Sequence, residues 1–237
     1  MRRTPLSLMK RVMLATIACG SVALLGACSS SSTDTMTSPS SNTVGSGTAA
    51  TESRAVAGFN AVSVSGAGHL IVERTGAESL QITADDNLLR LIQSEVVDGV
   101  LVLGFEPGTN VRTMQEVLYR VTAATLNGLS VSGVSRAEAF GIATEELTTD
   151  VSGVSTAMLL GNAATHRLTV SGPSTLDAPN LESRYVVANA SGPSRTLIRV
   201  SHTLTADASG PAIIEYLGEP VVTATATGGG LVRSAGP

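Results

Sequence analysis

The side chains that could support catalysis or metal binding form no recognisable constellation in this sequence. His69, His166 and His202 lack the close spacing of histidines that bind zinc from one helix. No Gly-x-Ser-x-Gly elbow surrounds any serine. Asp85 and Asp86 are adjacent, so on a strand they would point to opposite faces, and we expect them in a solvated turn. We therefore predict no catalytic residue, no metal site and no cofactor.

Cys28 is the one residue with a predictable chemical fate. A basic start and an apolar run from Val12 to Leu25 precede it, which is typical of a secretory signal. A transmembrane helix is the alternative, but it needs about 20 apolar residues. The sequence Leu25-Gly26-Ala27-Cys28 resembles the bacterial lipobox, whose thiol is alkylated by a diacylglyceryl group before cleavage. We predict a signal peptide over residues 1–27 and a membrane anchor on Cys28.

The composition of the mature chain excludes several partners. Cys19, the only other cysteine, lies in the signal, so the folded region has no disulfide and no cysteine metal site. Removing the signal leaves 11 arginines against 19 acidic residues, a side-chain charge of −8. Nucleic-acid binding relies on basic surfaces, so we expect no nucleic-acid partner. Ser29 stands where aspartate would retain an enteric lipoprotein in the inner membrane, which favours the outer membrane.

Three regions follow from composition. Residues 28–53 are rich in Ser, Thr, Gly and Ala, so they are predicted to be a disordered tether. Residues 54–237 suit one domain, with an apolar content that points to many short strands. Within that domain, residues 54–121 are irregular and are expected to cap one end of the regular region, residues 122–237.

A repeat dominates the regular region. A Ser-Gly pair recurs at intervals of 20, 19, 20 and 18 residues, and a similar pair lies near the start of the domain. The pairs are Ser65-Gly66, Ser132-Gly133, Ser152-Gly153, Ser171-Gly172, Ser191-Gly192 and Ser209-Gly210.

The flanks of each pair show how the repeat folds. Alternate positions before the glycine are apolar or small, as at Leu147, Thr149 and Val151, which is typical of a strand with one buried face. The phrase Ser-Gly-(Val/Pro)-Ser marks a corner, because glycine allows positive φ and proline cannot donate to a ladder. A second short strand is predicted after each corner, with a closing turn such as Gly161-Asn162.

Stacked units of about 20 residues predict a parallel β-solenoid with coils about 4.8 Å apart. The serines that precede the glycines would form a ladder bonded to one another or to the backbone. A sandwich or an antiparallel barrel also has regularly spaced strands, but neither needs one phrase at constant phase.

The domain resembles the head-GIN family of adhesin-type domains found in bacterial lipoproteins. The resemblance rests on Arg54–Gly66, Leu80–Leu88, Asp98–Leu103 and the Ser-Gly repeats, and it covers nearly all of residues 54–237. It implies a right-handed parallel β-helix and no established chemistry. Prolines at the corners depart from the small residues that are more usual there: Pro173, Pro193 and Pro211.

Parallel β-helices also include polysaccharide-cleaving enzymes, whose paired carboxyl groups lie about 5 to 9.5 Å apart. Stacked repeats place Asp150 and Asp207 three coils apart, about 14 Å. A second column alternates acids with apolar residues and spaces its acids about 10 Å apart: Glu138, Met158, Asp177, Leu197 and Glu215. We therefore expect a non-enzymatic, lipid-anchored scaffold whose flat face binds a protein or glycan, with a β-helix lyase or hydrolase as the alternative.

Overall fold

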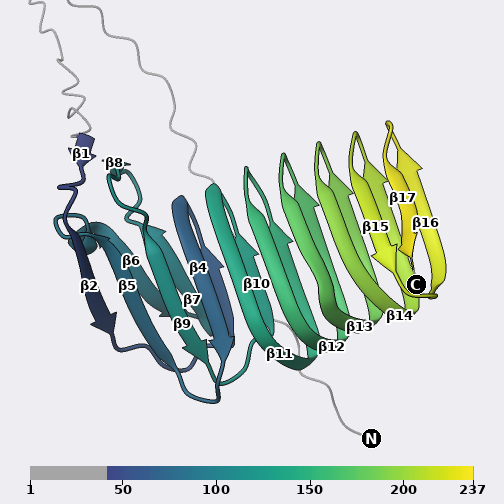
Figure 1. Cartoon of the computed structure of the whole chain (residues 1–237), viewed down its shortest axis with the longest axis horizontal. Coiled ribbons are helices and arrows are strands. Elements are labelled where there is room, and N and C mark those ends of the chain that lie inside the picture. Colours follow the sequence, from purple (N-terminus) through teal and green to yellow (C-terminus); the bar gives the residue numbers. More distant parts are fainter. Residues whose placement is uncertain (1–41, 237) are drawn as a thin grey trace, which may run out of the picture. The chain divides into compact units, whose positions relative to one another are not determined.

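The computed structural model describes residues 42–236, and these residues are almost entirely β-strand (Figure 1). The predicted signal peptide, Cys28 and most of the predicted tether lie outside the described residues. The only helix in the described part is the 3₁₀ turn η1, Leu89–Leu91.

Seventeen strands occur in the described chain. They are β1 (Asn42–Val44), β2 (Ala49–Arg54), β3 (Ala61–Val64), β4 (Ala67–Arg74), β5 (Ser79–Asp85), β6 (Ile92–Val97), β7 (Val100–Phe105), β8 (Asn110–Arg112), β9 (Leu118–Ala123), β10 (Gly128–Val131), β11 (Val134–Val151), β12 (Thr156–Ser171), β13 (Thr175–Ser191), β14 (Arg195–Ser209), β15 (Ile213–Leu217), β16 (Val221–Thr227) and β17 (Leu231–Gly236).

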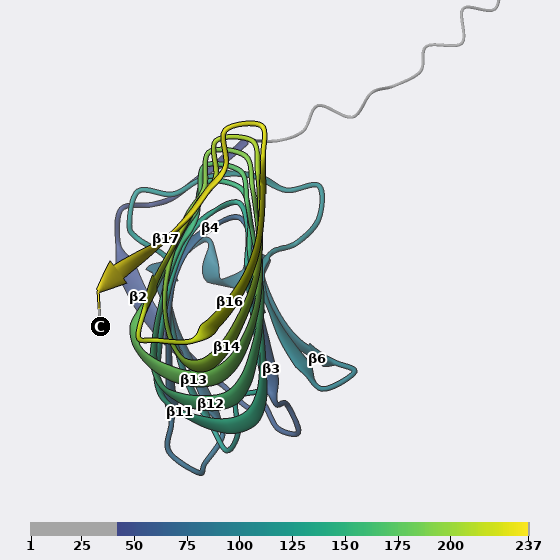
Figure 2. The same ribbon diagram turned by 90° about the vertical axis from the view of Figure 1, so that its right-hand side faces the viewer.

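The predicted parallel β-solenoid is confirmed. Strands β10 to β17 stack in parallel register, with Thr148 beside Arg167 and Arg167 beside Val187 on successive coils. Figure 2, which looks along the stack, shows flattened coils with a tight edge and a wide, curved edge. The tight edge holds the Ser-Gly corners, and the wide edge lies about half a coil further along the chain.

The coils contain fewer breaks than the sequence predicts. Each of β11 to β14 runs as one strand of 15 to 18 residues from one corner round to the next. At the predicted turn Gly161-Asn162 the strand continues and the register shifts instead, whereas the predicted turn at Gly218–Pro220 is present between β15 and β16. A bulge bends a strand without ending it, so the chain can curve while keeping its ladder.

The order of the first coils in space differs from their order in the chain. β3 and β4, which flank the corner at Ser65-Gly66, pair on one side with β10 and β11. On their other side they pair with β7 and β9, which come later in the sequence. The chain therefore lays down its second coil outside the first and then crosses back to continue the stack.

Antiparallel strands cover that outer coil. β6 pairs with β7, while β5 pairs with β9 and in turn with β2. These pairings occupy edges that would otherwise expose unpaired backbone groups.

The predicted tether is too long, because strand β2 lies inside it. Residues 49–54 pair antiparallel with β5, and Val44 of β1 aligns with Arg112 of β8. The composition of residues 42–53 provides almost no apolar surface, but the ladder and its hydrogen bonds order them without a core contribution. The folded domain thus begins before Arg54.

The core runs along the interior of the stack as columns of aliphatic side chains. One column contains Leu147, Val186 and Leu204, all buried. It also contains His166, whose side chain is fully buried among them.

Candidate functional site

The glycines of the predicted corners stack with positive φ, from 65° at Gly210 to 88° at Gly66. A Cβ added at Gly133 would lie 2.4 Å from the carbonyl oxygen of Gly66, and one at Gly153 would meet Gly133 in the same way. Coil stacking at Gly133 and Gly153 therefore requires glycine for both conformation and space. Glycine supplies backbone geometry at the corners rather than a ligand site.

At the corners of Gly133 and Gly172, the serine that makes the shorter hydrogen bonds stands two residues after the glycine, not before it. Ser135 Oγ donates to the carbonyl oxygens of Gly66 and Ser132, each at 3.0 Å. Ser174 repeats this with Gly153 at 3.0 Å and Ser171 at 2.8 Å. The predicted ladder serines are half-buried or exposed, and Ser132 Oγ reaches the oxygen of Val64 only at 3.4 Å.

The acids of the second predicted column are in register, as expected, but two of them are held in ion pairs. Glu215 lies 2.7 Å from Arg195 and 2.6 Å from Arg233, with 8% of its side chain exposed. The hydrogen bond from Arg233, with the charge of Arg195, holds the pKa of Glu215 below its usual value despite burial. Glu138 pairs with Arg136 at 2.7 Å. The negative charges of Glu138 and Glu215 are therefore balanced by arginines of the same or neighbouring coils.

Asp85 does not lie in a solvated turn, so that prediction is wrong. It is fully buried and accepts hydrogen bonds from the backbone N–H groups of Gly47 at 2.8 Å, Met114 at 3.0 Å and Gln115 at 3.0 Å. Burial alone would raise the pKa of Asp85, but these amide bonds outweigh it and the pKa is lowered. Asp86 is exposed, as expected for that residue.

Asn87 completes this clamp on the leading segment. Its side-chain oxygen accepts from the N–H of Ser46 at 2.9 Å, and its amide donates to the oxygen of Val44 at 2.8 Å. The run Asp85 to Asn87 therefore fastens residues 44–47 to the solenoid. It is a structural device rather than a catalytic pair.

The three histidines lie in different surroundings. His166 is buried, with Nε2 3.0 Å from Thr149 Oγ1, and burial lowers its pKa to about 4. His69 lies between the carboxylates of Glu116 and Glu138, at 3.6 and 3.4 Å. Residues 42–236 contain no cluster of three His, Cys, Asp or Glu side chains placed to hold a metal.

A hollow in the surface of the described residues forms a trough along the wide edge of the solenoid. Its volume is about 690 Å³. It spans five successive coils, from Thr144 on β11 to Glu219 after β15. The floor is the backbone and small side chains of the curved region, among them Ala163, Ala164 and Ser183.

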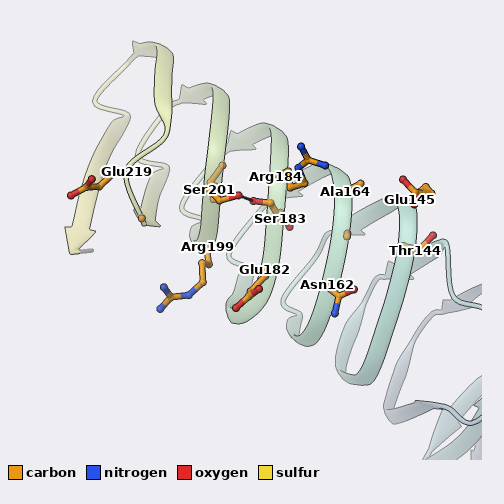
Figure 3. Close-up of a pocket in the computed structure, with 13 residues that line it drawn as sticks. Thr144, Glu145, Asn162, Ala164, Glu182, Ser183, Arg184, Arg199, Ser201 and Glu219 are labelled. Carbon is orange, nitrogen blue, oxygen red and sulfur yellow. Dashed lines mark hydrogen bonds between the residues drawn. The ribbon is translucent and has the colours of Figure 1, made fainter.

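Polar side chains line both sides of this trough (Figure 3). On one side, Asn162, Glu182 and Arg199 occupy aligned positions on three neighbouring coils. On the other side lie Glu145 and Arg184. The Nε of Arg199 donates to the oxygen of Pro179 at 2.9 Å, which fixes this guanidinium at the rim. Carboxylates, guanidinia and an amide would thus face any ligand that lay along the stack.

An aromatic pair stands beside the trough. The rings of Tyr185 and His202 lie 5.7 Å apart on neighbouring coils, and the guanidinium of Arg184 lies 5.6 Å from the centre of the tyrosine ring. Tyr185 is 44% exposed. An exposed aromatic ring next to rows of polar side chains suits a ligand that presents both an apolar face and hydroxyl or amide groups.

The sequence did not reveal this trough, because its residues have no constant phase in the repeat. They lie where bulges shift the register, between Ala178 and Glu182 and between Ser183 and Tyr185. One usable signal was the variation itself. Residues 143–145, 162–164 and 182–184 are polar or small and vary in type from coil to coil, whereas the corner and core positions repeat.

None of the helices in residues 42–236 has the length and hydropathy needed to cross a membrane. No curated protein matches this chain.

Solved structures share the fold. A "putative adhesin" from Bacteroides fragilis is 25% identical, with a TM-score of 0.68 over 81% of this chain and 99% of that one. A "putative adhesin" from Parabacteroides merdae is 18% identical, with a TM-score of 0.54 over 82% and 99%. A "putative lipid binding protein" from Parabacteroides distasonis is 14% identical, with a TM-score of 0.51 over the same shares.

The expected family resemblance is confirmed by a match over residues 58–220 to the family described as "Putative auto-transporter adhesin, head GIN domain". That match covers more than half of the chain. The chain therefore belongs to the head GIN domain family.

Proposed function

We propose that this protein is a lipid-anchored, non-enzymatic binding protein of the cell envelope, and that it holds an extended ligand in the trough on its wide edge. The proposal rests on the trough, which has aligned polar side chains on three or more coils and an exposed aromatic ring beside it. Family membership supports an adhesin-like role.

The trough chemistry favours a carbohydrate. Glu145, Glu182 and Arg184 are exposed and charged, so they can exchange bonds to water for paired bonds to hydroxyl groups. Tyr185 can stack on the apolar face of a sugar ring. A chain of sugars matches a groove that continues from coil to coil.

Three acids outside the trough have structural partners, which argues against their use in cleavage. Glu138 and Glu215 are engaged by arginines, and Asp85 by backbone amides. Each of these carboxylates has a lasting structural partner, whereas a glycosidase needs one acid free to donate a proton and another free to attack or activate water.

Binding can be tested with the purified protein on an array of bacterial and host glycans. The double variant Glu182→Ala, Arg184→Ala should weaken binding to any captured glycan by at least about tenfold, because two charge-assisted hydrogen bonds are lost. Arg74→Ala, an exposed arginine away from the trough, is the matched control and should leave binding unchanged.

The same glycans should be recovered intact after prolonged incubation. Turnover that disappears in Glu145→Gln or Glu182→Gln would replace the binding role with the enzymatic one. Equal binding by the double variant and the control would place the ligand elsewhere.

The anchor is tested separately by fractionating cells that express the protein. Replacing the cysteine, Cys28→Ser, removes the thiol that carries the lipid, so the protein should move from the membrane to the soluble fraction. A variant that stays in the membrane fraction would contradict lipid anchoring at this residue.

A further inference from the structure

An apolar ridge follows the tight edge of the solenoid. It consists of the residue after each corner glycine on five successive coils, and all five are exposed: Val134, Val154, Pro173, Pro193 and Pro211. Val134 is 65% exposed and Val154 is 57% exposed. With coils about 4.8 Å apart, the ridge is about 19 Å long.

None of the five ridge residues has an unpaired backbone N–H group. The N–H of Val134 donates to the oxygen of Gly66 at 2.7 Å, and that of Val154 to the oxygen of Gly133 at 2.8 Å. The other three positions are prolines, which have no N–H. Burying the ridge therefore strands no amide donor, and an unpaired buried donor is a main cost of desolvation.

The chain leaves the domain at this same edge. β1, which begins at Asn42, pairs with β8, and the residues of β8 line a hollow shared with Ser65, Gly66 and Ala67. Figure 1 shows β1 at the edge of the stack that holds the narrow turns. Two further apolar residues are exposed near this pairing: Val44 at the end of β1 and Met114 two residues after β8.

We infer that the tight edge rests on a lipid bilayer, with the apolar ridge in the boundary between headgroups and acyl chains. The inference rests on the proposed anchor at Cys28, which is separated from Asn42 by only 13 residues. Arg136 and Arg195 follow the ridge by two residues, but each is paired with a glutamate, so the ridge would enter the bilayer through its apolar side chains.

A bilayer fits this ridge better than a second protein does. The ridge is one residue wide and lies on a convex edge, whereas a stable protein interface buries about 800 Å² on each partner with good complementarity. Lipid can close around a narrow apolar line. The opposite, wide edge carries the trough, so this orientation directs the trough away from the membrane.

The test places a spin label on the ridge of the mature lipidated protein, reconstituted in vesicles of phosphatidylethanolamine and phosphatidylglycerol. The folded region has no cysteine, so Val154→Cys and Ala143→Cys each introduce one labelling site. Ala143 is exposed on the same coil as Val134 but lies at the wide edge.

The label at residue 154 should be relaxed at least fivefold more strongly by oxygen, which concentrates in lipid, than by a water-soluble nickel complex. The label at 143 should show the reverse preference. A label at 154 as accessible to nickel as the label at 143 would overturn the inference. Shielding of residue 154 from both reagents without vesicles would overturn it in favour of a second copy.

Sedimentation of the same samples with vesicles measures membrane attachment independently of the spin label. Protein that sediments with vesicles while residue 154 stays in water refutes the orientation and leaves the anchor intact. Release of the Cys28→Ser chain in cells decides the anchor without reference to the ridge.

Discussion

His166 is a titratable side chain in a column of aliphatic ones. Burial lowers its pKa to about 4, while in the unfolded chain its pKa is near its ordinary value of 6.5. Between these values the unfolded chain binds a proton that the folded domain does not. The free energy of unfolding should therefore fall as the pH drops from about 6.5 to about 4, by up to about 3 kcal/mol, and this contribution then levels off.

Urea unfolding of the wild type and of His166→Leu between pH 7 and pH 4 measures this effect. The variant matches Leu147 and Leu204 in the same column, so it should lose most of the slope. Thr149→Val is combined with it, because the threonine hydroxyl would otherwise lose its partner. An equal slope in the double variant would assign the pH dependence to other groups.

Asp85 matters through the three amides that it holds. In Asp85→Asn one acceptor oxygen is replaced by an NH₂ group that cannot accept from Met114 and Gln115. Residues 44–54 should then exchange their amide hydrogens at least about tenfold faster, while β12 is unaffected. Unchanged exchange in β2 would mean that its ladder with β5 suffices to hold this segment.

At the scale of elements, the corner turns determine how closely coils can stack. Gly133→Ala should destabilise the domain by at least about 2 kcal/mol more than Gly210→Ala. Both glycines have positive φ, but a Cβ at 133 would lie 2.4 Å from a carbonyl oxygen, whereas one at 210 would lie 3.5 Å from its nearest neighbour. Thermal unfolding of the pair measures the difference. Equal losses would show that conformation alone sets the cost.

The repeat made the regular elements predictable. Constant spacing of Ser-Gly placed Glu138, Asp177 and Glu215 in one column, and the register of β11 to β15 confirms it. The bends were not predictable in the same way. Gly161 appeared to end a strand, but the parallel neighbours keep the ladder continuous and turn the break into a register shift.

The region before the repeat was harder for a physical reason. Coil order there depends on pairings between segments far apart in sequence, such as β3 with β7 and β4 with β9. No local pattern encodes that order. The clamp by Asp85 was missed for the same reason, since its three amide partners lie about 30 to 40 residues away.

At the scale of the whole molecule, the two edges of the solenoid differ in chemistry. The tight edge is apolar and lies where the chain leaves toward Cys28, and the wide edge carries the polar trough. If the trough holds a ligand on another surface, the solenoid is a spacer between that surface and the membrane.

Mechanical load would then enter the domain through β1 and β2. Tension between the anchor and a bound ligand would pull on Asn42 and reach the stack through the short pairing of β1 with β8, the antiparallel pairing of β2 with β5, and the clamp at Asp85. The long strands β11 to β14 each have a partner on both sides and yield later. Peeling residues 42–54 away would lengthen the connection by up to about 45 Å. Reversible detachment of residues 42–54 would therefore limit the force on the coils that line the trough.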